Sequence, residues 1–210
     1  MDKKYELTDE TIDIGGRILH RIQALRSFDS VRGGEFGGYI ESERNLEQTG
    51  NCWVFGEALV FDNALVCQNG WVSDKAQVCG NAQVYENSLV SGHAQVWGNA
   101  RIFGYAEIFG YTQISGCAQV YGAARVYGDA WVSGNACIYE DAQIFEKAHV
   151  WGCISVRGNA VISGNAVVFN RAWISGEARL DSGIWSRVIE IRGKQYIVST
   201  TLKKELVEYA

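Results

Sequence analysis

Several features that mark common protein classes are missing from this 210-residue sequence. No apolar run reaches the roughly 18 to 20 residues that a membrane-spanning helix needs. The first segment, Met1 to Leu7, is polar and lacks the apolar core of a signal peptide. We therefore expect a cytoplasmic protein with no membrane partner.

The sequence also lacks a concentration of charge of one sign. Its formal net charge is −5, and acidic and basic residues are mixed along the chain. A nucleic-acid-binding protein usually shows a basic stripe, and a protein that mimics DNA usually shows a dense acidic one. Neither pattern occurs, so we do not expect nucleic acid as a partner.

Cysteine is present, but its spacing fits no known framework. None of the six cysteines forms a CxxC pair, and their spacings match neither a zinc site nor a set of disulfides. We interpret them as small residues tolerated in a reducing compartment. The sequence thus predicts no metal and no cofactor. The cysteines are Cys52, Cys67, Cys79, Cys117, Cys137 and Cys153.

What the sequence does contain is a strict six-residue repeat. From Val54 to Ile174 every sixth residue is Val or Ile, and Leu180 closes the series. Two positions after each of them there is often glycine, followed by Asn or Asp. Two positions before each of them lies a small residue, usually alanine, with exceptions at Gly70, Ser88, Thr112 and Ile154.

This unit, Ala-x-Val-x-Gly-Asn, predicts a parallel β-helix. In an extended segment Ala and Val point to one side and both x residues to the other. Gly-Asn readily adopts positive φ, so the chain turns there. A helix cannot keep a period of six, because 3.6 residues per turn would rotate the apolar stripe around it. Three such sides make a triangular coil of eighteen residues, and about seven coils would stack at roughly 4.8 Å.

The repeat resembles that of hexapeptide-repeat proteins, in which an aliphatic residue is followed four positions later by a small one. This resemblance covers residues 51–180 and implies a left-handed β-helix. The fold hosts acyltransferases, carbonic anhydrases and non-catalytic proteins, so it does not decide the function. Phage and prophage proteins of this kind are similar in outline over Gly37-Gly38-Tyr39-Ile40-Glu41, Asn45-Leu46 and Gly50-Asn51-Cys52-Trp53-Val54.

The two ends of the chain lack the period, and we expect them to cap the open strand edges of the solenoid. Residues 1–50 predict a small β cap, with a strand over 18–25 and a turn-rich connection over 32–38. Residues 181–210 predict a hairpin over 188–198 that turns at Arg192-Gly193-Lys194, and a short terminal helix over 201–209. The solenoid lies between them, at 51–180.

The three histidines offer little catalytic chemistry. His20 lies in the N-terminal cap, His93 occupies a turn, and His149 points outward beside Trp151. His93 and His149 lie about three coils apart, roughly 14 Å, which is too far to share one metal ion. His149 is the weak candidate for the general base of an acyl-CoA-dependent acyltransferase; otherwise it is a solvated or interface histidine.

The outward position after each Val or Ile is aromatic twelve times. Residues eighteen apart should stack along one side, which places Tyr85, Phe103, Tyr121 and Tyr139 in one ladder and Phe109, Tyr127 and Phe145 in a second. The third side carries a glutamine column, Gln77, Gln95 and Gln113, continued by Trp131 and His149. The remaining aromatics are Phe55, Phe61, Trp97, Trp151 and Phe169.

These ladders have two compatible interpretations. Stacked rings and glutamine ladders stabilise a solenoid. Outward aromatics also anchor protein interfaces. We therefore expect a homo-oligomer, dimer or trimer, that serves as a non-enzymatic phage or prophage platform for a host protein, for example to inhibit a bacterial defence system. The alternatives are a hexapeptide acyltransferase that uses acyl-CoA and a structural or virion component.

Overall fold

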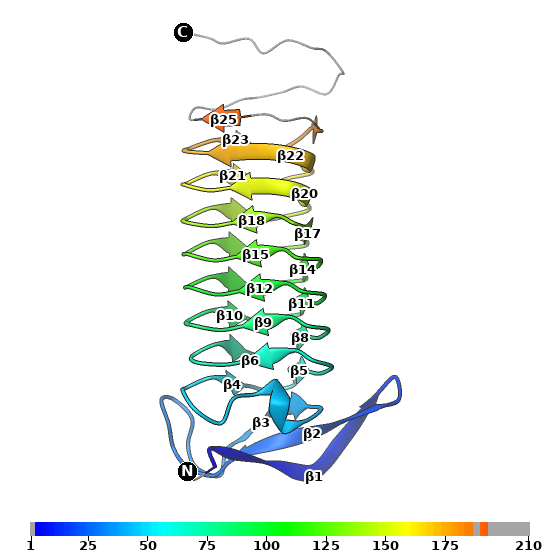
Figure 1. Cartoon of the computed structure of the whole chain (residues 1–210), viewed down its shortest axis with the longest axis vertical. Helices are drawn as coiled ribbons and strands as arrows, with labels where there is room; N and C mark the ends of the chain where they lie inside the picture. Colours follow the sequence, from blue (N-terminus) through cyan, green and yellow to red (C-terminus); the bar gives the residue numbers. More distant parts are fainter. Residues whose placement is uncertain (1–2, 187–189, 193–210) are drawn as a thin grey trace.

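The chain forms one long parallel β-solenoid with an antiparallel hairpin at its N-terminal end (Figure 1). The structure, a computed structural model, describes residues 3–186 and 190–192. It confirms the predicted all-β parallel β-helix, with eight strands stacked on one side where about seven coils were expected. No helix among the described residues is both long and apolar enough to span a membrane.

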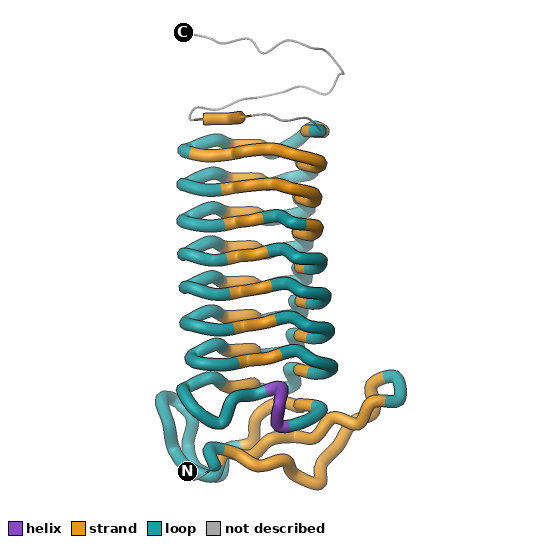
Figure 2. Tube along the Cα trace, in the orientation of Figure 1, coloured by secondary structure: helices purple, strands orange, loops and turns teal. Residues whose placement is uncertain are grey.

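Most solenoid strands have two residues, and turns make up the rest of each coil (Figure 2). The N-terminal elements are β1 (Tyr5–Ile14), β2 (Arg17–Ala24), β3 (Phe36–Ile40) and the 3-10 helix η1 (Glu43–Asn45). The solenoid strands are β4 (Trp53–Val54), β5 (Leu59–Val60), β6 (Leu65–Val66), β7 (Trp71–Val72), β8 (Gln77–Val78), β9 (Gln83–Val84), β10 (Leu89–Val90), β11 (Gln95–Val96), β12 (Arg101–Ile102), β13 (Glu107–Ile108), β14 (Gln113–Ile114), β15 (Gln119–Val120), β16 (Arg125–Val126), β17 (Trp131–Gly134), β18 (Cys137–Ile138), β19 (Gln143–Ile144), β20 (His149–Val156), β21 (Val161–Ile162), β22 (Val167–Ser175), β23 (Arg179–Leu180), β24 (Ile184–Trp185) and β25 (Glu190–Arg192).

Each side of a coil pairs in parallel with the side eighteen residues later. This spacing holds from the pairing of Trp53 with Trp71 to that of Ile162 with Leu180. It differs only at the ends: Tyr39 pairs with Leu59, twenty residues on, and Val167 pairs with Ile184, seventeen on. The first turn therefore begins within the segment predicted as cap, whereas the eight stacked strands, β4 to β23, all lie within the predicted solenoid.

The Val, Ile and Ala columns form the core along the whole solenoid, and nearly all of these side chains are fully buried. Burial of one Val or Ile side chain contributes roughly 1.5 to 3 kcal/mol to folding. Two hydroxyls stand where the repeat usually has alanine. Ser88 donates to the carbonyl oxygen of Tyr85 at 2.8 Å, and Thr112 donates to that of Phe109. These buried polar groups are therefore satisfied.

The corners between sides require left-handed backbone. At Gly110 (φ +80°), a Cβ would lie 2.7 Å from the carbonyl oxygen of Gly128 in the next coil. Where this corner position is not glycine, it carries a side chain that bonds the coil above it. Asp74 has φ 59°, and its carboxylate accepts the amide N–H of Gly92 at 2.9 Å. The same bond joins Glu86 to Gly104, Glu140 to Gly158 and Glu146 to Gly164.

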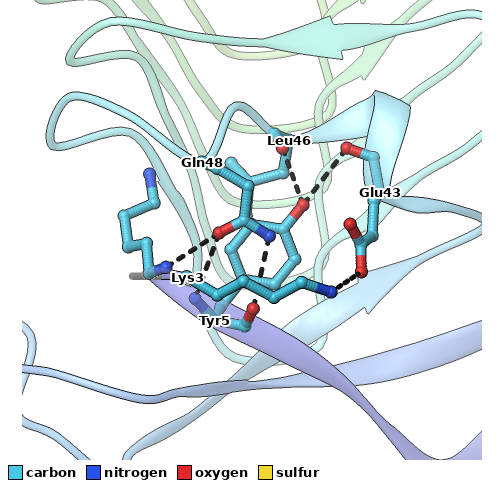
Figure 3. A network of polar contacts seen from close by, with 6 residues as sticks. Lys3, Tyr5, Glu43, Leu46 and Gln48 are labelled. Carbon is cyan, nitrogen blue, oxygen red and sulfur yellow. Dashed lines mark hydrogen bonds and ion pairs between the residues drawn. The ribbon is translucent and has the colours of Figure 1, made fainter. Parts of the chain in front are cut away.

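The N-terminal end of the core is closed by three aromatic rings and by polar contacts from β1. Trp53 is fully buried and packs edge-on against Tyr5 and Phe28, with ring centroids 6.0 and 5.4 Å apart. The Tyr5 hydroxyl donates to the backbone carbonyl oxygen of Leu46 at 2.6 Å, and the side-chain Oε1 of Gln48 accepts the backbone N–H of Lys4 at 2.8 Å (Figure 3). These contacts cover the strand edge that the first coil would expose.

The cap predictions are met in part by the described residues. Strand β2 covers the strand predicted over 18–25, whereas the predicted connection over 32–38 is shorter because β3 begins at Phe36. At the other end, β25 pairs in parallel with Trp173–Ser175 of β22. The rest of the hairpin predicted over 188–198, including its turn beyond Arg192, and the helix predicted over 201–209 lie outside the described residues.

The corner carboxylates yield a stability prediction. Asp74→Ala removes the bond to Gly92 and leaves a non-glycine residue at positive φ, so we expect it to lower the free energy of unfolding by about 1 to 2 kcal/mol. Asp74→Gly should cost less, because glycine adopts this φ without strain. Chemical denaturation of the three proteins measures this order. Lys75→Ala, at the next exposed position, is the control and should change stability by less than about 0.5 kcal/mol. Equal losses for all three variants would contradict the role of Asp74.

Candidate functional site

Each coil presents three outward faces, and each face receives one side chain before and one after a buried Val or Ile. We name the faces by their aromatic residues. The tyrosine face carries Tyr85, Phe103, Tyr121 and Tyr139, the mixed face carries Phe109, Tyr127 and Phe145, and the tryptophan face carries Trp97, Trp131 and Trp151. All the residues that the sequence singled out for binding therefore lie on these three faces.

The tyrosine face is built on a continuous stack of four rings. Successive ring centroids lie 5.0, 4.7 and 5.0 Å apart, and the ring planes deviate by 6° or less. Partial burial in the stack raises the pKa of Tyr85 and Tyr121. Arg101 stands in the adjacent column between Gln83 and Gln119. The eighteen-residue spacing thus produces the ladder that the sequence predicted.

Between Trp53 and Ser163, the mixed face satisfies its charges internally. Phe109, Tyr127 and Phe145 stack with centroids 4.9 and 4.8 Å apart. Beside them, Glu107 and Arg125 form an ion pair at 2.9 Å. By contrast, Arg101 and Arg157 on the tyrosine face form no ion pair among the described residues. The tyrosine face therefore has two arginines without ion-pair partners, whereas on the mixed face Arg125 is paired with Glu107.

The tryptophan face is free of formal charge. Its outward positions contain no Asp, Glu, Lys or Arg between Leu59 and Phe169. Trp131 and Trp151 are 42% and 37% exposed, and the Trp151 ring stacks on Phe169 with centroids 5.0 Å apart. In register along one column run Leu59, Gln77, Gln95, Gln113, Trp131, His149 and Val167.

Acidic side chains lie on the edges of the prism, and one edge carries them without basic residues. The edge between the mixed and tryptophan faces carries Glu57, Asp74, Asp129 and Glu146 together with Lys75 and Lys147. The edge between the tyrosine and mixed faces lies opposite the tryptophan face, and its corner positions carry no Lys or Arg within 68–177. The protein is therefore asymmetric in cross-section, with an uncharged side and a negative edge facing away from it. The acidic residues of this edge are Glu86, Glu140, Asp141 and Glu177.

The three histidines lie in three different surroundings. The ring of His149 meets the edge of Trp131 at 5.6 Å, and the ring of His93 stacks on Tyr111 at 4.7 Å. His20 Nδ1 lies 3.1 Å from the carbonyl oxygen of Thr8. Within 3–186 and 190–192, no three His, Cys, Asp or Glu side chains gather closely enough to hold a metal ion. The geometry thus places His149 in an aromatic column of the tryptophan face.

Some exposed aromatics were not singled out from the sequence. Tyr105 and Tyr111 occupy the corner position where the repeat has Asn or Asp, and Trp173 lies before rather than after a core Ile. The aromatic ladders predicted from the sequence also did not indicate that the tryptophan face lacks charged residues. Writing the sequence in rows of eighteen and counting charges by column would have shown both features, because this period holds for the whole prism.

The sequence comparisons agree with this architecture. Two segments, residues 76–92 and 118–134, match the family model described as the YdcK Beta solenoid repeat. Each begins on a core alanine, Ala76 or Ala118, and ends on a corner glycine, Gly92 or Gly134. These segments are similar to that repeat and support a β-solenoid repeat protein. The chain matches no curated protein.

The cysteines differ in burial and hence in acidity. Cys52 is fully buried in the N-terminal cap, where its sulfur lies 3.2 Å from Nζ of the buried Lys4. Burial raises the pKa of Cys52, Cys79 and Cys137, and it raises that of Cys67 to about 11. Cys117 and Cys153 lie exposed on the edge between the tryptophan and tyrosine faces. Since the exposed thiolate is the reactive form, these two should react fastest with reagents, and the half-buried Cys67, Cys79 and Cys137 more slowly.

Thiol labelling tests this assignment. At pH 8 a chromogenic disulfide reagent should modify two thiols of the native protein rapidly, Cys117 and Cys153. It should modify the half-buried Cys67, Cys79 and Cys137 more slowly, and Cys52 only after denaturation. In the double variant Cys117→Ser/Cys153→Ser, the fast phase should disappear. The measurement is the absorbance time course with peptide mapping by mass spectrometry. Rapid labelling of Cys52 or Cys67 in the native protein would contradict the burial described above.

Proposed function

We propose that this β-solenoid is a non-enzymatic binding platform of the phage or prophage type, whose tyrosine face binds a host protein. The observation that carries the proposal is the continuous stack of Tyr85, Phe103, Tyr121 and Tyr139 beside two arginines without ion-pair partners. Tyrosine and arginine are among the residues that contribute most to protein–protein binding.

Rigidity supports this role. Phe103 and Tyr121 are each held between two rings, and Tyr85 and Tyr139 each stack on one, so the freedom of these side chains has largely been lost on folding. A partner that docks on the stack orders few additional groups, which reduces the entropic cost of binding. Tyr and Trp in recognition surfaces act in the same way, as large contacts with few rotatable bonds.

The charge of the face indicates the chemistry of the partner. Arg101 and Arg157 are exposed, and the outward positions of this face from Leu65 to Ser175 contain no Asp or Glu. A partner with exposed carboxylates around an apolar patch would complement it. Binding should then weaken as salt screens these charges.

The finer part of the proposal concerns the biological setting. The resemblance of residues 37–54 and the following repeats to phage and prophage proteins supports a partner in the cytoplasm of a bacterial host. Inhibition of a bacterial defence system is one concrete form of such a role, since a rigid surface that covers a functional region of a host protein blocks it without chemistry. The support for inhibition of a defence system comes from the resemblance to phage and prophage proteins alone.

The proposal is tested on the tyrosine face. The protein is first purified with its associated host proteins, each co-purifying protein is identified by mass spectrometry, and binding is then measured with the purified candidate. Tyr121→Ser/Tyr139→Ser should weaken binding at least about tenfold, because two buried anchors are lost. The matched control is Tyr127→Ser/Phe145→Ser on the mixed face, which removes two stacked rings and should leave the affinity within about twofold. Equal effects of both double variants, or no effect of either, would contradict the assignment.

A further inference from the structure

Among the described residues, the tryptophan face is covered at its N-terminal end alone. There, the hairpin formed by β1 and β2 projects on the side of β5, β8 and β11 (Figure 1), and Leu19 of β2 packs in one cluster with Leu59 and Phe61. Beyond this coil most outward side chains are accessible, whereas Ser115 is 8% exposed. The exposed or half-exposed residues there include Gln95, Trp97, Gln113, Trp131, His149 and Trp151.

The charge distribution favours contact of this face with itself. The chain carries a net charge of −5, so two copies repel each other when their acidic groups approach. A contact through tryptophan faces brings no Asp, Glu, Lys or Arg of one face against the other. It also leaves the acidic edges, with Glu86 and Glu140, at the two outer ends of the pair. A face-to-face pair thus keeps the edge without Lys or Arg away from the contact. The edge between the mixed and tryptophan faces, which borders the contact, carries charges of both signs, from Asp74, Lys75, Asp129, Glu146 and Lys147.

The hydrogen-bonding groups of the face are also self-complementary. The side-chain amides of Gln95 and Gln113 and the indole N–H groups of Trp131 and Trp151 have no hydrogen-bond partner among the described residues. A glutamine amide both donates and accepts, whereas an indole only donates. Glutamines occupy the half nearer the N-terminus and Trp131 the half nearer the C-terminus. The two halves meet only if the copies run in opposite directions.

We infer that the tryptophan face is the contact surface between two copies of this chain, packed side by side and antiparallel. A two-fold axis across the face, midway between the coils of Gln113 and Trp131, sets Gln113 against the partner's Trp131 and Gln95 against the partner's His149. In the second column Ser115 then faces the partner's Ser133, and Trp97 faces the partner's Trp151. Gln95 and Gln113 each meet a ring from the partner, and the small serines lie at the centre.

The size of the face sets the strength of this pairing. The uncovered part spans about six coils of roughly 4.8 Å and is about 15 Å wide, so two faces with their edges would bury on the order of 1,000 Å². That area lies at the lower end of specific interfaces. A reversible dimer that dissociates at concentrations on the order of micromolar is therefore expected. The inference uses a different face from the one proposed to bind a host protein, and it holds whether or not that proposal does.

Sedimentation equilibrium over a range of protein concentrations tests the inference on the full chain. Trp131→Glu places a carboxylate inside the contact and should raise the dissociation constant at least about thirtyfold. The matched control is Trp173→Glu on the tyrosine face, because Trp173 is 49% exposed and Trp131 42%. This control and Tyr121→Ser/Tyr139→Ser should both remain dimeric. Circular dichroism confirms that each variant is folded.

The outcomes are decisive in either direction. A concentration-dependent dimer that only Trp131→Glu dissociates supports the inference. A wild-type protein that stays monomeric at concentrations on the order of 100 µM, a trimer, or a dimer that survives Trp131→Glu overturns it. Equal dissociation by Trp131→Glu and Trp173→Glu also overturns it, because the contact would then not be specific to the tryptophan face. A variant that loses host-protein binding but remains dimeric supports the role of the tyrosine face in that binding and is consistent with a dimer contact on the tryptophan face.

Discussion

The main-chain hydrogen bond between successive coils is the constraint on which the rest of this structure depends. The amide N–H of Gln95 donates to the carbonyl oxygen of Thr112 at 2.8 Å, and equivalent bonds recur from coil to coil. They require each side to lie directly over the side eighteen residues earlier. Each side chain therefore stacks on the side chain eighteen residues away. Where the sequence repeats a residue type at this spacing, the structure has a column of that type along the solenoid. The core, the ladders and the corner bonds all follow from this register.

The same constraint makes the ends of the solenoid special. A coil in the middle is paired on both sides, whereas the first coil would expose a row of unpaired groups and an open core. Trp53, Tyr5 and Phe28 close the core, and the fully buried Lys4 donates to the carbonyl oxygens of Thr49 and Cys52. Burial lowers the pKa of Lys4. A buried ammonium is tolerated here because its donors are satisfied by acceptors at the coil end.

The sequence predicts the features that recur in every coil, but it does not predict contacts that occur once in the structure. The period of six established the buried column from Val54 to Leu180, and the spacing of eighteen placed Tyr121 and Tyr139 in one stack. The twenty-residue first turn and the packing of Leu19 on Phe61 could not be read in advance, because they depend on a single contact between a hairpin and a coil. Burial of Lys4 was hidden for the same reason: nothing local marks it as an interior residue.

The location of charge on this protein follows from backbone geometry. A corner that must adopt positive φ takes either glycine or a residue whose side chain bonds the next coil, and Asp74, Glu86, Glu140 and Glu146 meet this need with a carboxylate. Carboxylates that stabilise corners necessarily lie on the edges of the prism. The flat faces are then free to carry aromatic and amide side chains, because solubility is maintained by charge at the edges. A solenoid that secures its turns in this way can leave a face uncharged between its edges, as the tryptophan face is between Leu59 and Phe169, and such a face can support contact with another protein.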